Sequence, residues 1–217
     1  MCTKLKHWSK ICSFFIILLT FCNFCVSATF TSTCPKANGV SQGCEIYLHG
    51  QIVEGDARRL TNAIKIPPTG GAVYRLLVLD SPGGDVNEAL LLTNVVRDAL
   101  LQTANYSTSD MYLKSAERFP TYTCASSCVL VLMSGVERYF SNLHGGGLGL
   151  HRPYFFAKTY SENTHPSAIA ERQHHAMQSA REYLVSEGLP DRLIEIMMNR
   201  SSKEIYWLTL QDWAGVR

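Results

Sequence analysis

Three short segments of this chain carry groups that could together perform acyl transfer. In chain order they read Ser81-Pro82-Gly83-Gly84, Cys124-Ala125-Ser126-Ser127-Cys128 and Leu150-His151-Arg152-Pro153. The first offers a glycine turn whose backbone N–H groups can face an anion, the second a serine nucleophile and the third a histidine base. We therefore expect the three segments to meet in one site.

Each segment also has a plain structural interpretation. Ser126 and Ser127 stand where a helix would begin, and serine is one of the residues preferred at that position. A histidine that ends a strand, as His151 is expected to, is more often structural than catalytic. The interpretation as a site depends on the three segments occurring together and in this order.

Apolar runs and helical periodicity alternate along the chain and indicate how these segments are held. Strands are predicted over residues 45–53, 73–79, within 111–123, and over 137–140 and 148–151, and helices over 55–65, 86–100, 126–134, 166–187 and 190–199. The run from Val73 to Leu79 is apolar enough for a buried parallel strand. Strands that alternate with helices predict a single α/β domain, whose sites form at the carboxyl ends of the strands.

The N-terminal segment, residues 1–28, is expected to direct export. Three lysines and no acidic residue precede an apolar stretch, residues 11–26, which ends at the small residues Ser27 and Ala28. This stretch is shorter than the ~20 residues that a membrane-spanning helix needs. We expect a cleaved signal peptide and a location in the bacterial periplasm or outside the cell. An uncleaved N-terminal anchor, which would attach the chain to a membrane, is the alternative.

The composition of the chain after this segment argues against several classes of function. Residues 29–217 carry 17 basic and 18 acidic side chains. Their length suffices for one domain, expected over residues 45–217 after a lead-in over residues 29–44. A near-neutral charge without a basic run excludes nucleic acid as a natural partner. His174 and His175 would point about 100° apart on a helix, so neither a metal nor another cofactor is expected.

Four cysteines lie beyond the N-terminal segment: Cys34, Cys44, Cys124 and Cys128. An even number in an oxidising compartment predicts two disulfides, with three possible connectivities. We expect Cys34–Cys44 and Cys124–Cys128, because each bond would close a short local loop. A zinc site is the alternative, and the wide spacing within each pair argues against it.

Taken together, these motifs resemble the Clp protease proteolytic-subunit family, within the wider ClpP/crotonase superfamily. Residues 46–53 resemble that family's first strand and Gly-Gln turn, and Asp80-Ser-Pro-Gly-Gly84 resembles its Asn-Ser-Pro-Gly-Gly turn. Ala125-Ser126 falls on its Ala-Ser nucleophile motif, and His151-Arg152-Pro153 falls on its His-Gln-Pro motif, without a gap between the two. The resemblance covers residues 45–155 and fades afterwards.

The resemblance implies a ClpP/crotonase-like spiral of β-β-α units and assigns roles to residues of this chain. Ser126 would be the nucleophile and His151 the general base, and the backbone N–H groups of Gly84 and Ser127 would form the oxyanion hole. The family's rings and trimers imply that this chain also forms a homo-oligomer.

The chain departs from the family at the third catalytic position. The family has an aspartate there, and the nearest match in this sequence is Asn199. An asparagine can orient an imidazole but cannot stabilise its charged form, a change that costs about 10⁴-fold in turnover where an aspartate normally serves. Asp191 and Glu195 could substitute from the neighbouring helix, although neither matches by spacing.

These motifs predict an exported serine hydrolase. The expected activity is that of a peptidase that cleaves short or unfolded peptides through an acyl-enzyme and without ATP, since an exported chain meets little ATP. The alternative is a catalytically weak or inactive protein that uses the same cleft to bind a peptide or acyl ligand. The substitution at Asn199 is the main support for this alternative.

Overall fold

The computed structural model describes residues 27–34, 36–37, 40–41, 43–68, 72–107, 122–142, 146–153, 165–201 and 203–216. Its strands are β1 (Thr29–Thr33), β2 (Lys36–Ala37), β3 (Val40–Ser41), β4 (Cys44–His49), β5 (Tyr74–Asp80), β6 (Gln102–Ala104), β7 (Thr123–Ala125), β8 (Arg138–Tyr139), β9 (Gly147–Leu150) and β10 (Tyr206–Trp207). Its helices are α1 (Asp56–Lys65), α2 (Val86–Asp98), α4 (Cys128–Met133), α5 (Pro166–Ser186), α6 (Asp191–Asn199) and α7 (Leu210–Trp213). Most of the expected signal segment and of the strand predicted within 111–123 lies outside the described residues.

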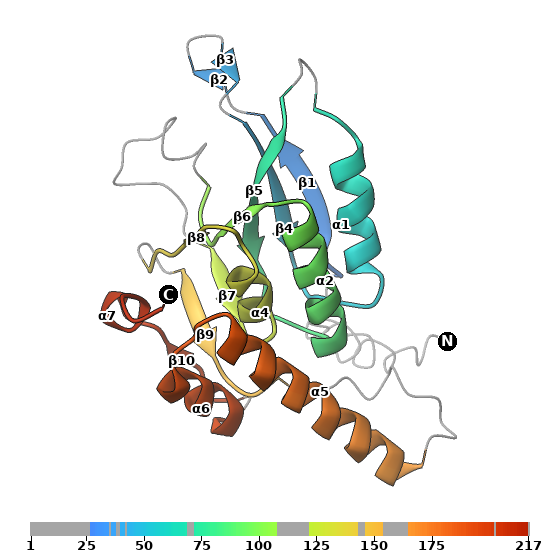
Figure 1. Ribbon diagram of the computed structural model, residues 1–217, viewed down its shortest axis with the longest axis vertical. Coiled ribbons are helices and arrows are strands. Elements are labelled where there is room, and N and C mark those ends of the chain that lie inside the picture. Colours follow the sequence, from blue (N-terminus) through green and yellow to red (C-terminus); the bar gives the residue numbers. More distant parts are fainter. Residues whose placement is uncertain are drawn as a thin grey trace, which may run out of the picture.

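The strands form a five-stranded sheet, a three-stranded sheet and a small hairpin (Figure 1). The larger sheet has the order β1-β4-β5-β6-β8, and all its strands are parallel except β1, which runs antiparallel to β4. The smaller sheet has the order β10-β9-β7, with β7 and β9 parallel and β10 antiparallel to β9. The chain is therefore a mixed α/β domain, in agreement with the predicted class.

Backbone pairing just beyond strand β5 joins the two sheets. The N–H of Ser81 donates to the carbonyl of Thr123 at 2.6 Å, and the N–H of Ala125 donates back to the carbonyl of Ser81 at 2.9 Å. This parallel bridge aligns the direction of β5 with that of β7. The carboxyl ends of β4, β5, β7 and β9 consequently lie along one edge of the molecule, and this edge is called the site edge below.

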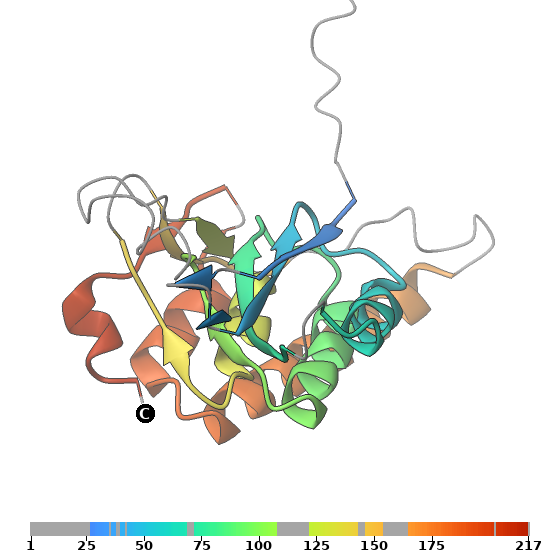
Figure 2. The same ribbon diagram turned by 90° about the horizontal axis from the view of Figure 1, so that it is seen from above.

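Helices α1, α2, α4 and α5 gather on one face of the strands (Figures 1 and 2). The core between the two layers is aliphatic and includes Ile46, Leu48, Leu77, Leu79, Leu92, Leu130, Leu132 and Leu184. Helix α2 begins after an N-cap at Asp85, whose carboxylate accepts the N–H of Glu88 at 2.8 Å. Every residue of α4 is buried, which explains its uninterrupted apolar sequence after Cys128.

The segment expected as a lead-in begins inside the larger sheet. Thr29–Thr33 forms edge strand β1, in a register that pairs Thr29 with His49 of β4. The preceding Ala28 is 4% exposed and donates its N–H to the carbonyl of Gln51 at 2.8 Å. The chain therefore enters the domain at the carboxyl end of β4.

Both expected disulfides are confirmed. Cys34 is bonded to Cys44 and Cys124 to Cys128. In the ranges that the structure describes, no helix is both long and apolar enough to cross a membrane.

Candidate active site

Ser126 lies in the turn between strand β7 and helix α4. Its φ angle is 56°, in the left-handed region that costs a residue with a side chain about 1–2 kcal/mol. Backbone strain of this kind persists where the surroundings impose it, and it concentrates at functional sites. Here the N–H of Ser126 donates to the carbonyl of Gly149 at 2.9 Å, which ties the strained residue to strand β9.

His151 directly follows strand β9, the neighbour of β7. Because the two parallel strands pair Ala125 with Gly149, Ser126 and His151 leave the site edge from adjacent strands. The Nδ1 atom of His151 lies 3.1 Å from the carbonyl oxygen of Arg152. A carbonyl can only accept, so this bond places the proton on Nδ1 and leaves Nε2 free to take one, as a general base requires. No hydrogen bond joins the side chains of Ser126 and His151 among the described residues.

The glycine turn packs directly against the serine turn. A methyl group built on Gly83 would lie 2.7 Å from the Cβ of Ser126 and 2.6 Å from the carbonyl oxygen of Ala125. Gly83 also has a φ angle of 92°, so a residue with a side chain would be both strained and obstructed there. The glycine turn predicted from the sequence therefore meets the nucleophile turn.

One of the two expected oxyanion donors is already engaged. The N–H of Gly84 donates to the hydroxyl oxygen of Ser127 at 2.7 Å, and that hydroxyl donates to the carbonyl of Gly84 at 3.1 Å. Ser127 is completely buried, so water does not compete for this contact. An oxyanion could reach the N–H of Gly84 only after the Ser127 side chain had turned away.

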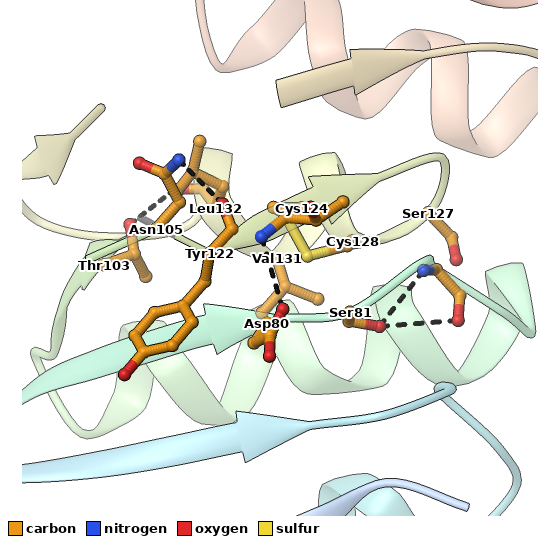
Figure 3. Close-up of a disulfide and its surroundings, with 12 residues drawn as sticks. Asp80, Ser81, Thr103, Asn105, Tyr122, Cys124, Ser127, Cys128, Val131 and Leu132 are labelled. Atoms are coloured by element: carbon orange, nitrogen blue, oxygen red, sulfur yellow. Dashed lines mark hydrogen bonds between the residues drawn. A yellow bond between two sulfur atoms is a disulfide. The ribbon is translucent and has the colours of Figure 1, made fainter. Parts of the chain in front are cut away.

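A disulfide encloses the nucleophile turn (Figure 3). Cys124 and Cys128, both fully buried, are bonded across Ser126. Strand β5 supports the same turn from the other side, because Asp80 Oδ1 accepts the N–H of Thr123 at 3.2 Å. Next to it, the hydroxyl of Ser81 accepts the N–H of Gly83 at 3.1 Å. The turn is thus fixed by a covalent bond and by side chains of the neighbouring strand.

The structure does not bring Asn199 to the histidine. Asn199 is exposed at the end of α6 and donates from Nδ2 to Glu195 Oε2 at 2.8 Å. Glu195 in turn accepts from Arg181 at 2.6 Å. In the described part of the chain neither of these residues, nor the exposed Asp191, hydrogen-bonds to His151.

An apolar residue lies over strand β9 close to its end. The β9–β10 ladder pairs Leu150 with Tyr206, and Ile205 directly precedes Tyr206. The Ile205 Cγ2 atom would lie only 2.7 Å from a methyl group built on Gly149, which places it over the strand that ends at His151. An aliphatic side chain there cannot orient the imidazole, and the Arg152 carbonyl is the partner that does so.

One further polar pair, which was not predicted from the sequence, lies at the site edge. His49 Nδ1 lies 2.6 Å from Asp80 Oδ2, at positions that the β4–β5 register pairs. In the sequence, Asp80 directly follows the strand predicted over 73–79, whereas His49 lies inside the strand predicted over 45–53, which in the structure ends at His49. The His49 side chain is 67% exposed, and ion pairs of such exposure contribute little to stability. The pair links the ends of β4 and β5 rather than adding a reacting group near Ser126.

The site therefore contains a serine in a strained turn and a buried histidine whose proton lies on Nδ1. It lacks a carboxylate on the histidine within the described residues, and one of its anion-binding N–H groups is occupied. In the same part of the chain, no cluster of three or more histidine, cysteine, aspartate or glutamate side chains could hold a metal ion. No protein-family model matches this chain, and no curated protein matches its sequence significantly.

Proposed function

We propose that this protein is an exported serine hydrolase of the ClpP/crotonase superfamily, a peptidase that acts on short or unfolded peptides without ATP. The observation that carries the proposal is the conformation of Ser126, which has a φ angle of 56° at the end of β7, beside His151 on the adjacent strand end. Capping does not account for this conformation, because the N-cap of α4 is Ser127, which has ordinary helical backbone angles.

The proposed chemistry is acyl transfer through Ser126. The Ser126 Oγ attacks the peptide carbonyl carbon while its proton passes to His151 Nε2. The C–N bond then breaks, and His151 returns that proton to the leaving amine. Water subsequently hydrolyses the acyl-enzyme, with His151 again acting as the base. The N–H of Ser127 is the oxyanion donor available at the start, and that of Gly84 joins when the Ser127 hydroxyl moves.

Because the hydrogen-bond partner of His151 is a backbone carbonyl, we expect slow turnover. A backbone carbonyl keeps Nδ1 protonated and fixes the ring, but it carries no full charge to stabilise the imidazolium. Replacing the aspartate of a catalytic triad by a neutral group lowers turnover by about 10⁴-fold. We therefore expect acylation of Ser126 to be easier to detect than repeated turnover.

Two further features support the proposal, one in the fold and one in the disulfides that bear on its location. The parallel order β4-β5-β6-β8, with helices on one face, is compatible with a spiral of β-β-α units. Two disulfides are compatible with an oxidising compartment and hence with export. The oligomer is proposed from the family resemblance alone.

The alternative is a protein that binds a peptide or acyl ligand in the same cleft without cleaving it. Two observations favour it: the bond between Gly84 and Ser127, and the absence of a carboxylate from His151 among the described residues. Both would weaken catalysis without preventing the binding of a ligand.

Labelling with a fluorophosphonate probe separates the two functions. The purified, oxidised protein would be compared with Ser126→Ala, His151→Ala and a control, Ser134→Ala, which removes another buried serine hydroxyl from the far end of α4. The hydrolase predicts labelling of the wild type and of Ser134→Ala, and its loss from the other two variants. A folded wild type that is not labelled would overturn the hydrolase and favour the binding protein.

A further inference from the structure

A pocket of about 830 Å³ lies beside the end of strand β9, between helices α5 and α6. This volume is within the range of small-ligand sites. Its walls include Arg152, Pro153, Met177, Arg181, Glu195 and Met198. Arg152 directly follows His151, so the pocket opens next to the candidate base and is called the α5–α6 pocket here.

The backbone of Arg152 is held from both sides, which fixes where its side chain begins. Its N–H donates to the carbonyl of Arg200 at 3.0 Å, and its own carbonyl accepts from His151. Its side chain is exposed and lines the pocket. In the part of the chain that the structure describes, no carboxylate or other acceptor engages its guanidinium group.

The other charged groups of the pocket balance each other. Arg181 and Glu195 form an ion pair at 2.6 Å, and the Arg181 guanidinium lowers the pKa of the Glu195 carboxyl. Glu195 also accepts from Asn199, so both of its oxygens have partners. Among the described residues of the wall, His174 is the remaining titratable one. Arg152 therefore gives the pocket a net positive charge.

The remaining walls are suited to an apolar group. Met177 from α5 and Met198 from α6 face the pocket together with Pro153. Methionine side chains adapt to ligands of different shape because they are unbranched and polarizable. The pocket thus combines one guanidinium that no described acceptor engages, which prefers a carboxylate in a forked contact, with an adaptable apolar surface.

We propose that the α5–α6 pocket binds the carboxy-terminal end of a peptide, with Arg152 holding the terminal carboxylate and the methionines contacting the last side chain. This inference deepens the proposed function, on which it rests, because it names the substrate as peptides with a free carboxy-terminus. An apolar side chain alone would not need the arginine, and a phosphate would not need the methionines.

The chemistry fixes which fragment occupies the pocket. A free terminal carboxylate always belongs to the fragment that leaves as an amine when a peptide bond is cleaved. Ser126 Oγ forms the new ester bond to the upstream carbonyl, the C–N bond breaks, and the leaving nitrogen receives its proton from His151. The released product is a short carboxy-terminal fragment held by Arg152, and water then cleaves the ester.

Binding can be tested without relying on catalysis. The Ser126→Ala protein would be titrated with the fluorescein-labelled peptide Gly-Ala-Ala-Ala-Leu as a free acid and as its carboxy-terminal amide, with fluorescence anisotropy as the readout. We expect the acid to bind about 10- to 100-fold more tightly than the amide. Arg152→Gln in the same background should remove this difference, and Arg152→Lys should retain part of it.

Arg172→Gln is the matched control, because it removes the same charge from α5 at an exposed position that lines a different pocket. It should preserve the preference for the acid. Equal binding of acid and amide, or an equal loss in both arginine variants, would overturn the inference even if Ser126 reacts with fluorophosphonate. Conversely, a preference that depends on Arg152 would support it even if Ser126 proved unreactive.

Discussion

The backbone N–H of Gly84 donates to the hydroxyl oxygen of Ser127 at 2.7 Å, although the two residues lie far apart in the sequence. The residue after the candidate nucleophile therefore closes the anion site that the glycine turn would otherwise offer. The contact is buried and reciprocal, since the same hydroxyl donates to the carbonyl of Gly84. Under the proposed mechanism, this contact would limit the reactivity of the site without any change in its fold.

Removing that hydroxyl should make the site more reactive. Ser127→Ala is expected to speed fluorophosphonate labelling by up to about 10²-fold, because a single oxyanion-hole donor is worth about that factor. The loss of a buried hydrogen bond should lower the free energy of unfolding by about 1 kcal/mol. Labelling time courses and urea denaturation measure the two effects. Slower or unchanged labelling of a folded variant would show that the N–H of Gly84 is not used.

The two disulfides should differ in their effect on the site. Replacing Cys124 and Cys128 by alanine is expected to cost about 2 kcal/mol of stability and to slow labelling of Ser126, because the bond encloses the nucleophile turn. Replacing Cys34 and Cys44 is the control. Its longer loop predicts a slightly larger cost, about 3 kcal/mol, with labelling unchanged. Equal labelling of the two double variants would contradict a role of the first bond in positioning Ser126.

Helix α2 ends in a motif that normally requires glycine. Leu101 donates its N–H to the carbonyl of Val96 at 3.0 Å, and Leu100 donates to that of Arg97 at 2.9 Å. This pattern places Leu100 in the left-handed conformation, with a φ angle of 52° and 72% of its surface exposed. Helix α5 ends in the same pattern, but its left-handed residue is Gly188.

Leu100→Gly is therefore expected to stabilise the protein by about 1 kcal/mol, since it relieves the left-handed strain while the exposed side chain contributes little by burial. The measurement is the midpoint of urea denaturation, which should rise without a change in slope. Gly188→Ala is the reciprocal control and should lower stability by about 1 kcal/mol. A destabilised Leu100→Gly would indicate that the leucine makes a contact outside this chain.

Asp212 should make stability depend on pH in the acid range. The pKa of its carboxyl is lowered to about 2, chiefly by the hydrogen bond from the N–H of Thr209 at 3.0 Å and further by the Thr209 hydroxyl, Arg192 and Tyr206. Because the folded pKa lies below the unfolded value, this stabilisation is present above about pH 4. It is lost as the pH falls toward 2.

Asp212→Asn should consequently lower the free energy of unfolding by about 1 kcal/mol at pH 7, after allowance for solvent screening of this partly exposed group. The difference between variant and wild type should vanish near pH 2. Urea denaturation at several pH values measures it. Glu204→Gln, at an exposed position in a nearby turn, is the control for the loss of one negative charge. A difference that persists unchanged at pH 2 would contradict the assigned cause.

The sequence predicted the elements whose signals are local and strong. Helix α2 has an aspartate at its N-cap and a long apolar face, and strand β5 is a nearly continuous apolar run. Strand β6 was missed because Gln102–Ala104 is only three residues long and has a mixed composition. Strand β10 was missed because pairing with β9, rather than local periodicity, makes Tyr206 and Trp207 a strand. Helix α7 was missed because it is only four residues long.

For the candidate site, the sequence predicted the residue types and the strand ends that carry them, but not the hydrogen-bond partners of the side chains. The neighbouring strand ends of Ser126 and His151 follow from parallel pairing. The hydrogen-bond partner of His151 could not be predicted in this way. Every residue has a backbone carbonyl, so the sequence does not indicate that the carbonyl of Arg152 binds the ring. Spacing suggested Asn199 as that partner, but spacing along the chain cannot indicate the direction of a side chain at a helix end. In the structure this amide bonds to Glu195.

The position at which the chain enters the larger sheet would couple removal of the N-terminal segment to the accessibility of the site edge. Ser27 already pairs with Gln51, and Thr29 pairs with His49, at the edge from which Ser126 and His151 also emerge. The apolar stretch ends at Val26, so no spacer separates it from the folded domain. If that stretch remained in a lipid bilayer, the site edge would be held close to the lipid headgroups, where only slender, extended chains could reach it. Proteolytic release would open the same edge to the surrounding solution, so the fate of the N-terminal segment would decide how large a substrate the protein could meet.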